Sequence, residues 1–125
     1  MTDDGRRVIL VADDDEDILT LVTAVLTRSG HEVIPARNGT EALAAARDRH
    51  PDLAVLDVAM PELDGLEVLE RLRGDPDTRD LPVVLLSARV QEDDVARGFA
   101  TGANAYVRKP FTPQELTERV AELLP

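Results

Sequence analysis

Five short apolar segments recur along the chain, and within each segment the apolar residues are consecutive rather than alternating with polar ones. The segments are Val8–Ala12, Glu32–Ala36, Leu53–Asp57, Pro82–Ser87 and Ala105–Arg108. Runs of β-branched residues and leucine are typical of strands that are covered on both faces, as in parallel sheets. The pattern therefore predicts five strands, of which the second is the weakest and the fifth the shortest.

The stretches that follow these segments have a helical period, because their apolar residues recur every three or four positions and so share one face. The positions are Ile18, Leu19, Val22, Val25 and Leu26; an alanine-rich stretch over Thr40–Arg49; Leu66, Leu69 and Leu72; Val95, Phe99 and Ala100; and Leu116, Val120, Leu123 and Leu124. Helix ends are predicted near Ser29-Gly30, before Pro51, at Gly74 and at Gly102. The last helix is predicted to begin at Thr112-Pro113, with Glu115 in the capping-box position.

Five alternations of strand and helix account for the sequence. They predict an α/β fold, a (βα)5 doubly wound parallel five-stranded sheet with right-handed crossovers. The chain has 125 residues, which is the usual size of one domain, so we expect a single domain over residues 1–125.

Composition narrows the possible functions. The chain has 14 basic and 25 acidic residues, a formal net charge of −11, and no cysteine. The missing cysteines exclude a disulfide framework, a thiol nucleophile and a cysteine-based metal site. The acidic balance argues against direct nucleic-acid binding. No apolar run approaches the roughly 20 residues that span a bilayer, and the first residues lack the apolar core of a signal peptide. We therefore expect a cytoplasmic domain that does not bind membranes.

Polar residues whose side chains could take part in catalysis or metal binding follow four of the predicted strands. They are Asp13, Asp14 and Asp15 after the first, Asp57 at the end of the third, Ser87 at the end of the fourth and Lys109 after the fifth. In doubly wound sheets, ligands bind outside the carboxyl ends of the strands. The sequence therefore predicts that acids, a hydroxyl and an ammonium meet at one edge of the sheet.

Three carboxylates at this edge need a cation or must be protonated. At ~5 Å and an effective dielectric constant of 20, each pair of carboxylates repels by roughly 3 kcal/mol. A few carboxylates with open positions suit Mg²⁺, which bridges to phosphate oxygens. Together with Lys109 and Ser87 they have the groups needed to stabilise a transferring phosphoryl group. Without His or Cys at the edge, the predicted nucleophile is a carboxylate, which would form an aspartyl phosphate.

Each of these residues also has a simpler interpretation. The acidic run from Asp13 to Asp17 is compatible with a solvated helix N-terminus, Asp57 with an ordinary turn residue, Ser87 with a structural hydroxyl and Lys109 with a surface lysine. That all of these fall at one edge favours a site. His31 and His50 flank predicted strands at the opposite end of the sheet and are interpreted as surface residues.

Four segments in order resemble the receiver domain of bacterial two-component response regulators. They are VILVADDDEDI (8–18), LAVLDVAMPELDG (53–65), VVLLSA (83–88) and GANAYVRKPFTPQEL (102–116), and the resemblance extends from about Arg6 to Leu124. It implies a flavodoxin-like strand order of 2-1-3-4-5.

The resemblance also implies a role for each site residue. Asp57 corresponds to the phosphoacceptor, and Asp13, Asp14, Asp57 and the main-chain carbonyl of Ala59 to the Mg²⁺ ligands, with Asp13 acting mainly through water. Ser87 and Lys109 correspond to the groups that bind phosphoryl oxygens. Ser87 and Tyr106 correspond to the switch pair, and the Lys109–Pro110 peptide bond is expected to be cis.

The same resemblance implies that the protein is a phosphorylation-activated switch rather than a turnover enzyme. A sensor histidine kinase, a His-phosphotransfer protein or a small phosphodonor supplies the phosphoryl group. The surface formed by the fourth helix, fifth strand and fifth helix then changes to control an unknown output protein or output domain.

Two departures from the family pattern modify these expectations. Regulators that dimerise symmetrically often have two acids before the switch aromatic, whereas here the positions are Asn104 and Ala105, although Arg119 remains. We therefore expect a monomer or a weak phosphorylation-dependent dimer. Ala59 and Arg89 occupy positions that often tune phosphate lifetime, and Ala59 has no group that orients an attacking water. We expect slow autodephosphorylation.

Three alternatives remain. A haloacid-dehalogenase-like phosphohydrolase shares Asp13-x-Asp15, Ser87 and Lys109, but the threonine expected two residues after the second aspartate is Asp17. A receiver-shaped interaction module that takes no phosphate is disfavoured because the acidic pair, acceptor, hydroxyl and lysine are all present. A flavodoxin-like mononucleotide binder is disfavoured because no Gly/Ser/Thr-rich phosphate loop follows the first strand.

Overall fold

The structure, a computed structural model, describes residues 7–88 and 92–124. Its centre is a sheet of five parallel strands in the order β2-β1-β3-β4-β5. The strands are β1 (Val8–Ala12), β2 (Glu32–Ala36), β3 (Leu53–Asp57), β4 (Val83–Ser87) and β5 (Ala105–Arg108). The predicted fold class and strand order are therefore confirmed.

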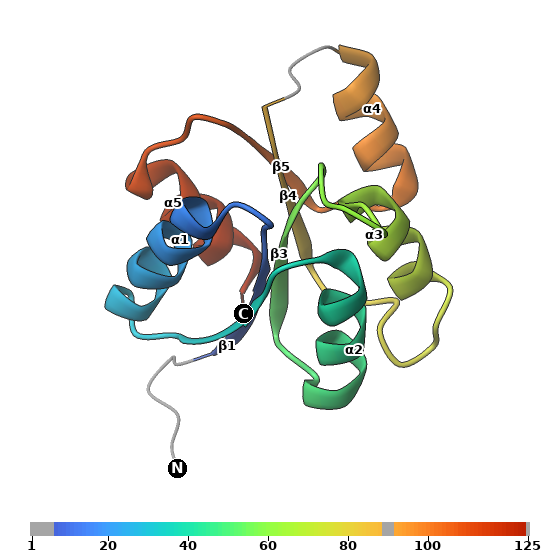
Figure 1. Cartoon of the computed structure of the whole chain (residues 1–125), viewed down its shortest axis with the longest axis horizontal. Helices are drawn as coiled ribbons and strands as arrows, with labels where there is room; N and C mark the ends of the chain where they lie inside the picture. Colours follow the sequence, from blue (N-terminus) through green and yellow to red (C-terminus); the bar gives the residue numbers. More distant parts are fainter. Residues whose placement is uncertain (1–6, 89–91, 125) are drawn as a thin grey trace.

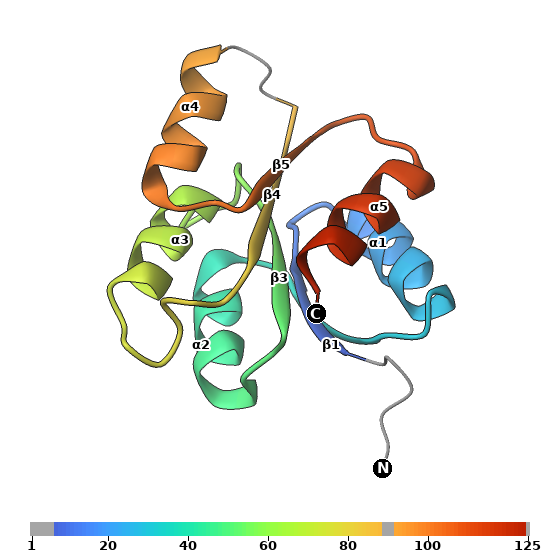
Figure 2. The same cartoon turned by 180° about the vertical axis from the view of Figure 1, so that it is seen from behind.

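Five helices cover the two faces of the sheet. They are α1 (Glu16–Arg28), α2 (Gly39–Arg49), α3 (Gly65–Arg73), α4 (Glu92–Thr101) and α5 (Pro113–Leu123). Helices α1 and α5 lie on one face, and α2, α3 and α4 lie on the other (Figure 1). The same arrangement is seen from behind in Figure 2. Within the described part of the chain, none of the helices has the length and apolar character needed to cross a bilayer.

The consecutive apolar residues of the central strands serve both faces. In β1, Leu10 and Ala12 pack in the core cluster that includes residues of α2 and α3. Ile9 and Val11 pack in the cluster that includes residues of α1 and α5. Because side chains alternate along a strand, a strand buried on both faces needs apolar residues at every position. β3 and β4 are buried along their whole length for the same reason.

The helix ends are as predicted in most places. Ser29 is the C-cap of α1, Gly74 is the C-cap of α3, and Gly102 follows α4 with a φ of 117°. Thr112 and Glu115 form a capping box at the start of α5. Such caps satisfy backbone groups that a helix end leaves unpaired.

Four details differ from the sequence predictions. β4 begins at Val83 rather than Pro82, and α2 begins at Gly39 rather than Thr40. Phe99 and Ala100, predicted on the apolar stripe of their helix, are both exposed, Phe99 to 47%, because α4 is buried at Gly98 and leaves the other side to solvent. His31, predicted at the surface, is partly buried, and its Nδ1 atom has no hydrogen-bond partner among the described residues.

Candidate functional site

The sheet brings the predicted site residues to one edge. Asp13 and Asp14 follow β1, Asp57 and Ser87 are the last residues of β3 and β4, and Lys109 follows β5. Because all five strands are parallel, these carboxyl ends lie on the same side of the sheet. β1, β3, β4 and β5 are consecutive neighbours in it, so segments separated by up to 96 residues come into contact.

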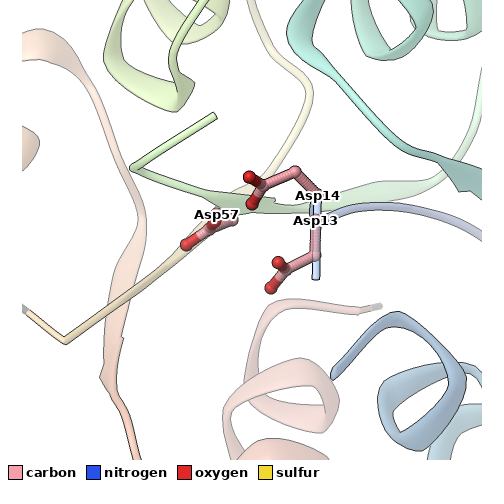
Figure 3. A group of neighbouring side chains, drawn as sticks. All are labelled: Asp13, Asp14 and Asp57. Atoms are coloured by element: carbon pink, nitrogen blue, oxygen red, sulfur yellow. The ribbon is translucent and has the colours of Figure 1, made fainter. Parts of the chain in front are cut away.

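The three aspartates gather their carboxylates in one place (Figure 3). One ligand oxygen from each of Asp13, Asp14 and Asp57 lies within 4.8 Å of the others. Asp13 is fully buried and Asp57 is 4% exposed, whereas Asp14 is at the surface. The cluster is therefore closed on the side of the sheet and open to solvent at Asp14.

Lys109 is the cation of this pocket. Its Nζ atom donates to Oδ2 of Asp13 at 2.9 Å and to Oδ1 of Asp57 at 3.1 Å. Its backbone N–H donates to the carbonyl of Ser87 at 2.8 Å, which fixes the start of the β5–α5 loop beside β4. The Lys109–Pro110 peptide bond is cis, as expected from the resemblance.

The charges in the pocket shift two pKa values. Burial and, after it, the nearby carboxylate of Asp13 raise the pKa of Asp57, the hydrogen bond from Lys109 opposes both effects, and the net result is a pKa of about 6. Burial by itself lowers the pKa of Lys109, but its hydrogen bonds to Asp13 and Asp57 outweigh this and the pKa is raised. The ammonium therefore stays charged while Asp57 resists ionisation.

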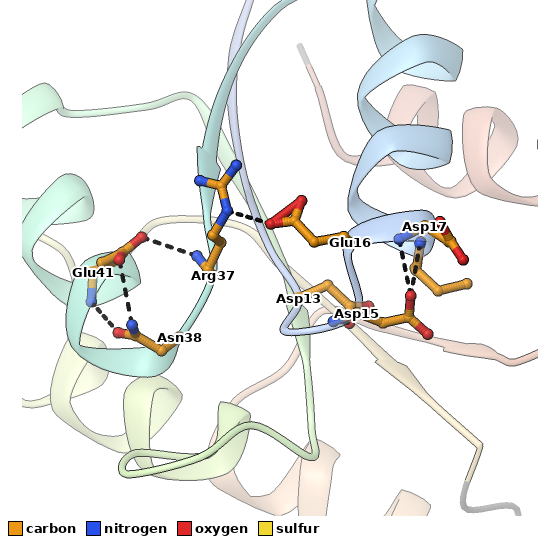
Figure 4. Close-up of polar contacts among 8 residues, drawn as sticks. Asp13, Asp15, Glu16, Asp17, Arg37, Asn38 and Glu41 are labelled. Atoms are coloured by element: carbon orange, nitrogen blue, oxygen red, sulfur yellow. Dashed lines mark hydrogen bonds and ion pairs between the residues drawn. The ribbon is translucent and has the colours of Figure 1, made fainter.

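The acidic run after β1 divides between the pocket and the helix. Asp15 is the N-cap of α1, and its Oδ1 accepts from the N–H groups of Asp17 and Ile18 (Figure 4). The Oδ1 atom of Asp13 accepts from the N–H of Asp15 at 2.9 Å. The helix-N-terminus interpretation thus applies to Asp15, whereas Asp13 and Asp14 face the pocket.

An ion pair lies beside this turn. Arg37, which follows β2, pairs through Nε with Glu16 at the start of α1, and its backbone N–H donates to Glu41 at 3.0 Å (Figure 4). The contact links the start of α1 to the loop between β2 and α2, which holds these two neighbouring loops together.

The remaining predicted residues lie around the pocket. Ser87 is 2% exposed, Ala59 lies exposed in the loop after β3, and Tyr106 is half-buried. Tyr106 packs against the core cluster on the α2 and α3 face. Arg89 lies outside the described residues. The roles that the resemblance implies for all of these residues remain predictions.

Asn104 has contacts that the sequence did not indicate. Its Oδ1 accepts from the backbone N–H of Val83 at 2.9 Å and from Nη2 of Arg73 at 3.0 Å. Arg73 also donates through Nε and Nη2 to the carbonyl of Gly102. Arg119 pairs with Glu122 of its own helix.

The pocket has the composition of a divalent-cation site. Three carboxylates and one ammonium leave a net charge of −2 when all are ionised. All the potential ligand atoms of the three aspartates are hard carboxylate oxygens, which suit Mg²⁺. Asp13, Asp14 and Asp57 therefore fit the ion that the resemblance implies.

Comparison with known proteins gives the class of this fold and site. The family model of the response regulator receiver domain matches residues 9–121. The alkaline phosphatase synthesis transcriptional regulatory protein PhoP of Bacillus subtilis is 46% identical over 119 residues, which are 95% of this chain and 49% of PhoP. The phosphate regulon transcriptional regulatory protein PhoB of Pseudomonas aeruginosa is 37% identical, over 94% of this chain and 52% of PhoB.

Solved structures agree with the sequence comparisons. A putative response regulator from Chloroflexus aurantiacus superposes with a TM-score of 0.90 at 37% identity, covering 94% of this chain and 97% of that one. The chemotaxis protein CheY4 of Vibrio cholerae superposes with a TM-score of 0.89 at 31% identity, covering 94% and 98%.

The chain belongs to the response regulator receiver family. Receiver domains are signalling domains rather than turnover enzymes, and phosphorylation and Mg²⁺ binding are characteristic of the family. Response regulators receive phosphoryl groups from histidine kinases. The chain spans about half the length of the curated relatives it matches.

Proposed function

We propose that this chain is a phosphorylation-activated switch whose phosphoacceptor is Asp57. The observation that carries the proposal is the pocket itself: the carboxylate of Asp57 lies beside two further carboxylates and accepts a hydrogen bond from Lys109. A carboxylate, a cation and an acidic pair are the groups that phosphoryl transfer to aspartate requires.

Asp13, Asp14 and Asp57, with the main-chain carbonyl of Ala59, would hold Mg²⁺. When bound, the ion neutralises carboxylate and phosphoryl oxygens, which lowers the electrostatic barrier to the approach of an anionic donor. Both carboxylate oxygens of Asp13 already accept hydrogen bonds, Oδ1 from the N–H of Asp15 and Oδ2 from Lys109, which supports its assignment as an indirect ligand.

In the reaction an oxygen of Asp57 forms a bond to phosphorus, and the bond from phosphorus to the donor breaks. The leaving group, the imidazole of a phospho-histidine or the acetate of acetyl phosphate, keeps the electron pair of that bond. Lys109 would exchange a carboxylate partner for a phosphoryl oxygen, and Ser87 would donate its hydroxyl to another. Most of the catalysis is positioning and electrostatic stabilisation.

The phosphoryl group adds up to about two negative charges beside β4 and β5. Ser87 and Lys109 are drawn toward it, and Tyr106 would change its packing as the surface of α4, β5 and α5 rearranges. That surface would control an output domain or a separate output protein. Because Ala59 has no polar side-chain group to hold an attacking water, loss of the phosphoryl group would be slow, and the decay of label after removal of the donor measures it.

The test is phosphorylation by acetyl phosphate with Mg²⁺, followed by phosphate-affinity electrophoresis and by mass spectrometry of peptides. Wild type and the control Asp48→Asn, an exposed aspartate of α2, should be labelled, and Asp57→Asn should not. Equal labelling of Asp57→Asn would show that the acceptor is another residue. Beryllofluoride with Mg²⁺ adds a second test, because a receiver-shaped module that takes no phosphate should not respond to it.

A further inference from the structure

The loop between β3 and α3, residues 58–64, lies between two helix starts that approach it closely. At the beginning of α3, a Cβ atom on Gly65 would lie 2.3 Å from the carbonyl oxygen of Asp57. At the beginning of α2, a Cβ atom on Gly39 would lie 1.8 Å from the carbonyl oxygen of Leu63. Both distances are shorter than any real contact, so there is no space for a methyl group on either side of the loop.

The loop is tied together internally. The N–H of Gly65 donates to the carbonyl of Val58 at 2.9 Å, and the N–H of Leu63 donates to the carbonyl of Pro61 at 2.8 Å. Glu62 adopts a φ of 69°, which is costly for a residue with a side chain and is maintained only by its surroundings. These features make residues 58–65 a compact unit.

The side chains of the loop anchor this unit to α2. Val58, Met60 and Leu63 are buried in the same core cluster as Ala42 and Leu43. A close-packed core transmits a displacement rather than absorbing it. A shift at Leu63 is therefore passed to the other end of the loop, where Asp57 and Ala59 lie.

We propose that Gly39 is a positioning residue of the phosphoacceptor pocket, because its missing side chain lets the first turn of α2 set the position of the loop that follows Asp57. This inference rests on the function proposed above. Gly39 lies outside the pocket and touches none of the reacting atoms. It acts through the carbonyl of Leu63, 24 positions further along the chain.

The displacement that a methyl group would cause is large on the scale of metal coordination. Relieving the contact from 1.8 Å to the 3.0 Å minimum of real Cβ contacts needs a shift of at least about 1.2 Å. Mg²⁺ accepts ligand distances of about 2.0–2.1 Å with near-octahedral geometry. A misplacement of about 1 Å costs roughly 100-fold in reaction rate. We expect Gly39→Ala to weaken Mg²⁺ binding and slow phosphorylation by at least about tenfold each.

Helix propensity alone predicts the opposite result, namely that Gly39→Ala does not harm the fold. The φ of Gly39 is not positive, and alanine favours a helical conformation more than glycine does. If the contact with Leu63 were unimportant, Gly39→Ala would leave the pocket unchanged and the fold as stable as before or more so.

The experiment compares Gly39→Ala with two controls. Gly74→Ala also replaces a glycine at the end of a helix. The nearest neighbour of the added Cβ atom would be the carbonyl oxygen of Glu70 at 3.5 Å, which is an ordinary contact. Val120→Ala removes buried volume on the opposite face of the sheet. It controls for effects that arise from a general loss of stability. Mg²⁺ affinity by calorimetry, the labelling rate with acetyl phosphate and unfolding by urea are measured for each.

We expect only Gly39→Ala to lose Mg²⁺ affinity, with both controls within threefold of wild type. A folded Gly39→Ala chain with wild-type Mg²⁺ affinity overturns the inference and leaves the proposed function intact. A wild-type chain that neither binds Mg²⁺ nor is labelled overturns both.

If Gly39→Ala does not fold, the wild-type chain supplies the measurement. In a Mg²⁺ titration followed by amide resonances, Gly39 and Thr40 should shift with the same midpoint as Val58 and Ala59, while Gly74 stays unchanged. Gly39 and Thr40 resonances that do not move while those of Val58 and Ala59 do would overturn the inference.

Discussion

Replacing Asp57 by asparagine should stabilise the metal-free chain at neutral pH. The amide has nearly the shape of the acid, removes the negative charge and keeps an oxygen that accepts from Lys109. Asparagine therefore imitates the protonated form of Asp57, and the folded chain favours that form more than the unfolded chain does, since burial and Asp13 raise the pKa of this carboxyl to about 6.

The size of the effect follows from the rise of the Asp57 pKa from its ordinary value of 3.8 to about 6. At about 1.4 kcal/mol per unit, the shift corresponds to at most about 3 kcal/mol. The pocket is open to solvent at Asp14, and solvent screening reduces this, so we expect about 1–2 kcal/mol. For a chain of this size that is about 3–10 °C in melting temperature.

The sign of the pH dependence is fixed by the direction of the shift. Between about pH 4 and about pH 6 the folded chain binds more protons at Asp57 than the unfolded chain does, so its free energy of unfolding falls as the pH rises. The destabilisation from Asp57 is absent below the unfolded pKa and complete above the folded one. The advantage of Asp57→Asn should therefore be small near pH 4 and reach its full value above about pH 7.

The assay is urea unfolding followed by far-ultraviolet circular dichroism in the presence of a chelator, at about pH 5 and about pH 7.5. The quantity of interest is the difference between wild type and Asp57→Asn at each pH, because the other carboxyl groups titrate in both chains and cancel. Asp48→Asn, at an exposed position, is the control and should show no such difference. If Asp57→Asn were less stable than wild type at about pH 7.5, or equally stable at both pH values, the argument from burial and charge would be wrong.

Three further predictions concern other parts of the chain. Lys109→Met leaves the buried carboxylates without their ammonium and should destabilise the metal-free chain by about 3 kcal/mol in urea unfolding, and added Mg²⁺ should stabilise this variant more than it stabilises wild type. Asp64→Ala removes one half of the capping box at the start of α3 and should cost about 1 kcal/mol in urea unfolding. Leu85→Ala, at a fully buried position, should cost about 2–5 kcal/mol in thermal unfolding, whereas Phe99→Ala should cost well under 1 kcal/mol because Phe99 is 47% exposed.

The strands and the edge of the sheet were predictable from sequence because they depend on local patterns. A strand such as β3, buried at all five positions, needs a consecutive apolar run, and that run is visible without any structure. Once parallel strands are inferred, their carboxyl ends meet at one edge by geometry alone. The convergence of Asp13, Asp57 and Lys109 was therefore predictable although they are far apart in sequence.

The features that the sequence did not reveal depend on contacts between distant segments. Nothing near Gly39 indicates that a carbonyl 24 residues later lies where its side chain would be. The contact from Arg73 to Asn104 joins residues 31 positions apart and belongs to no periodic pattern. The exposure of Phe99 likewise depends on how α4 is tilted over β5, which helical spacing does not determine.

The energetics of the pocket have a consequence for how this sequence is interpreted. A single substitution at Asp57 is expected to make the metal-free fold more stable, and two further carboxylates lie beside it. A fold optimised for stability would not keep three acids around one ammonium at the edge of its sheet. Natural proteins retain such destabilising groups where a function depends on them. A net charge of −2 that Lys109 leaves uncompensated costs free energy in the empty pocket, and the same charge is what a divalent cation binds most strongly. The instability of the empty site and its proposed affinity for Mg²⁺ thus have one physical origin, the uncompensated negative charge. A substitution that stabilises the metal-free chain by removing this charge should therefore also weaken the binding of Mg²⁺.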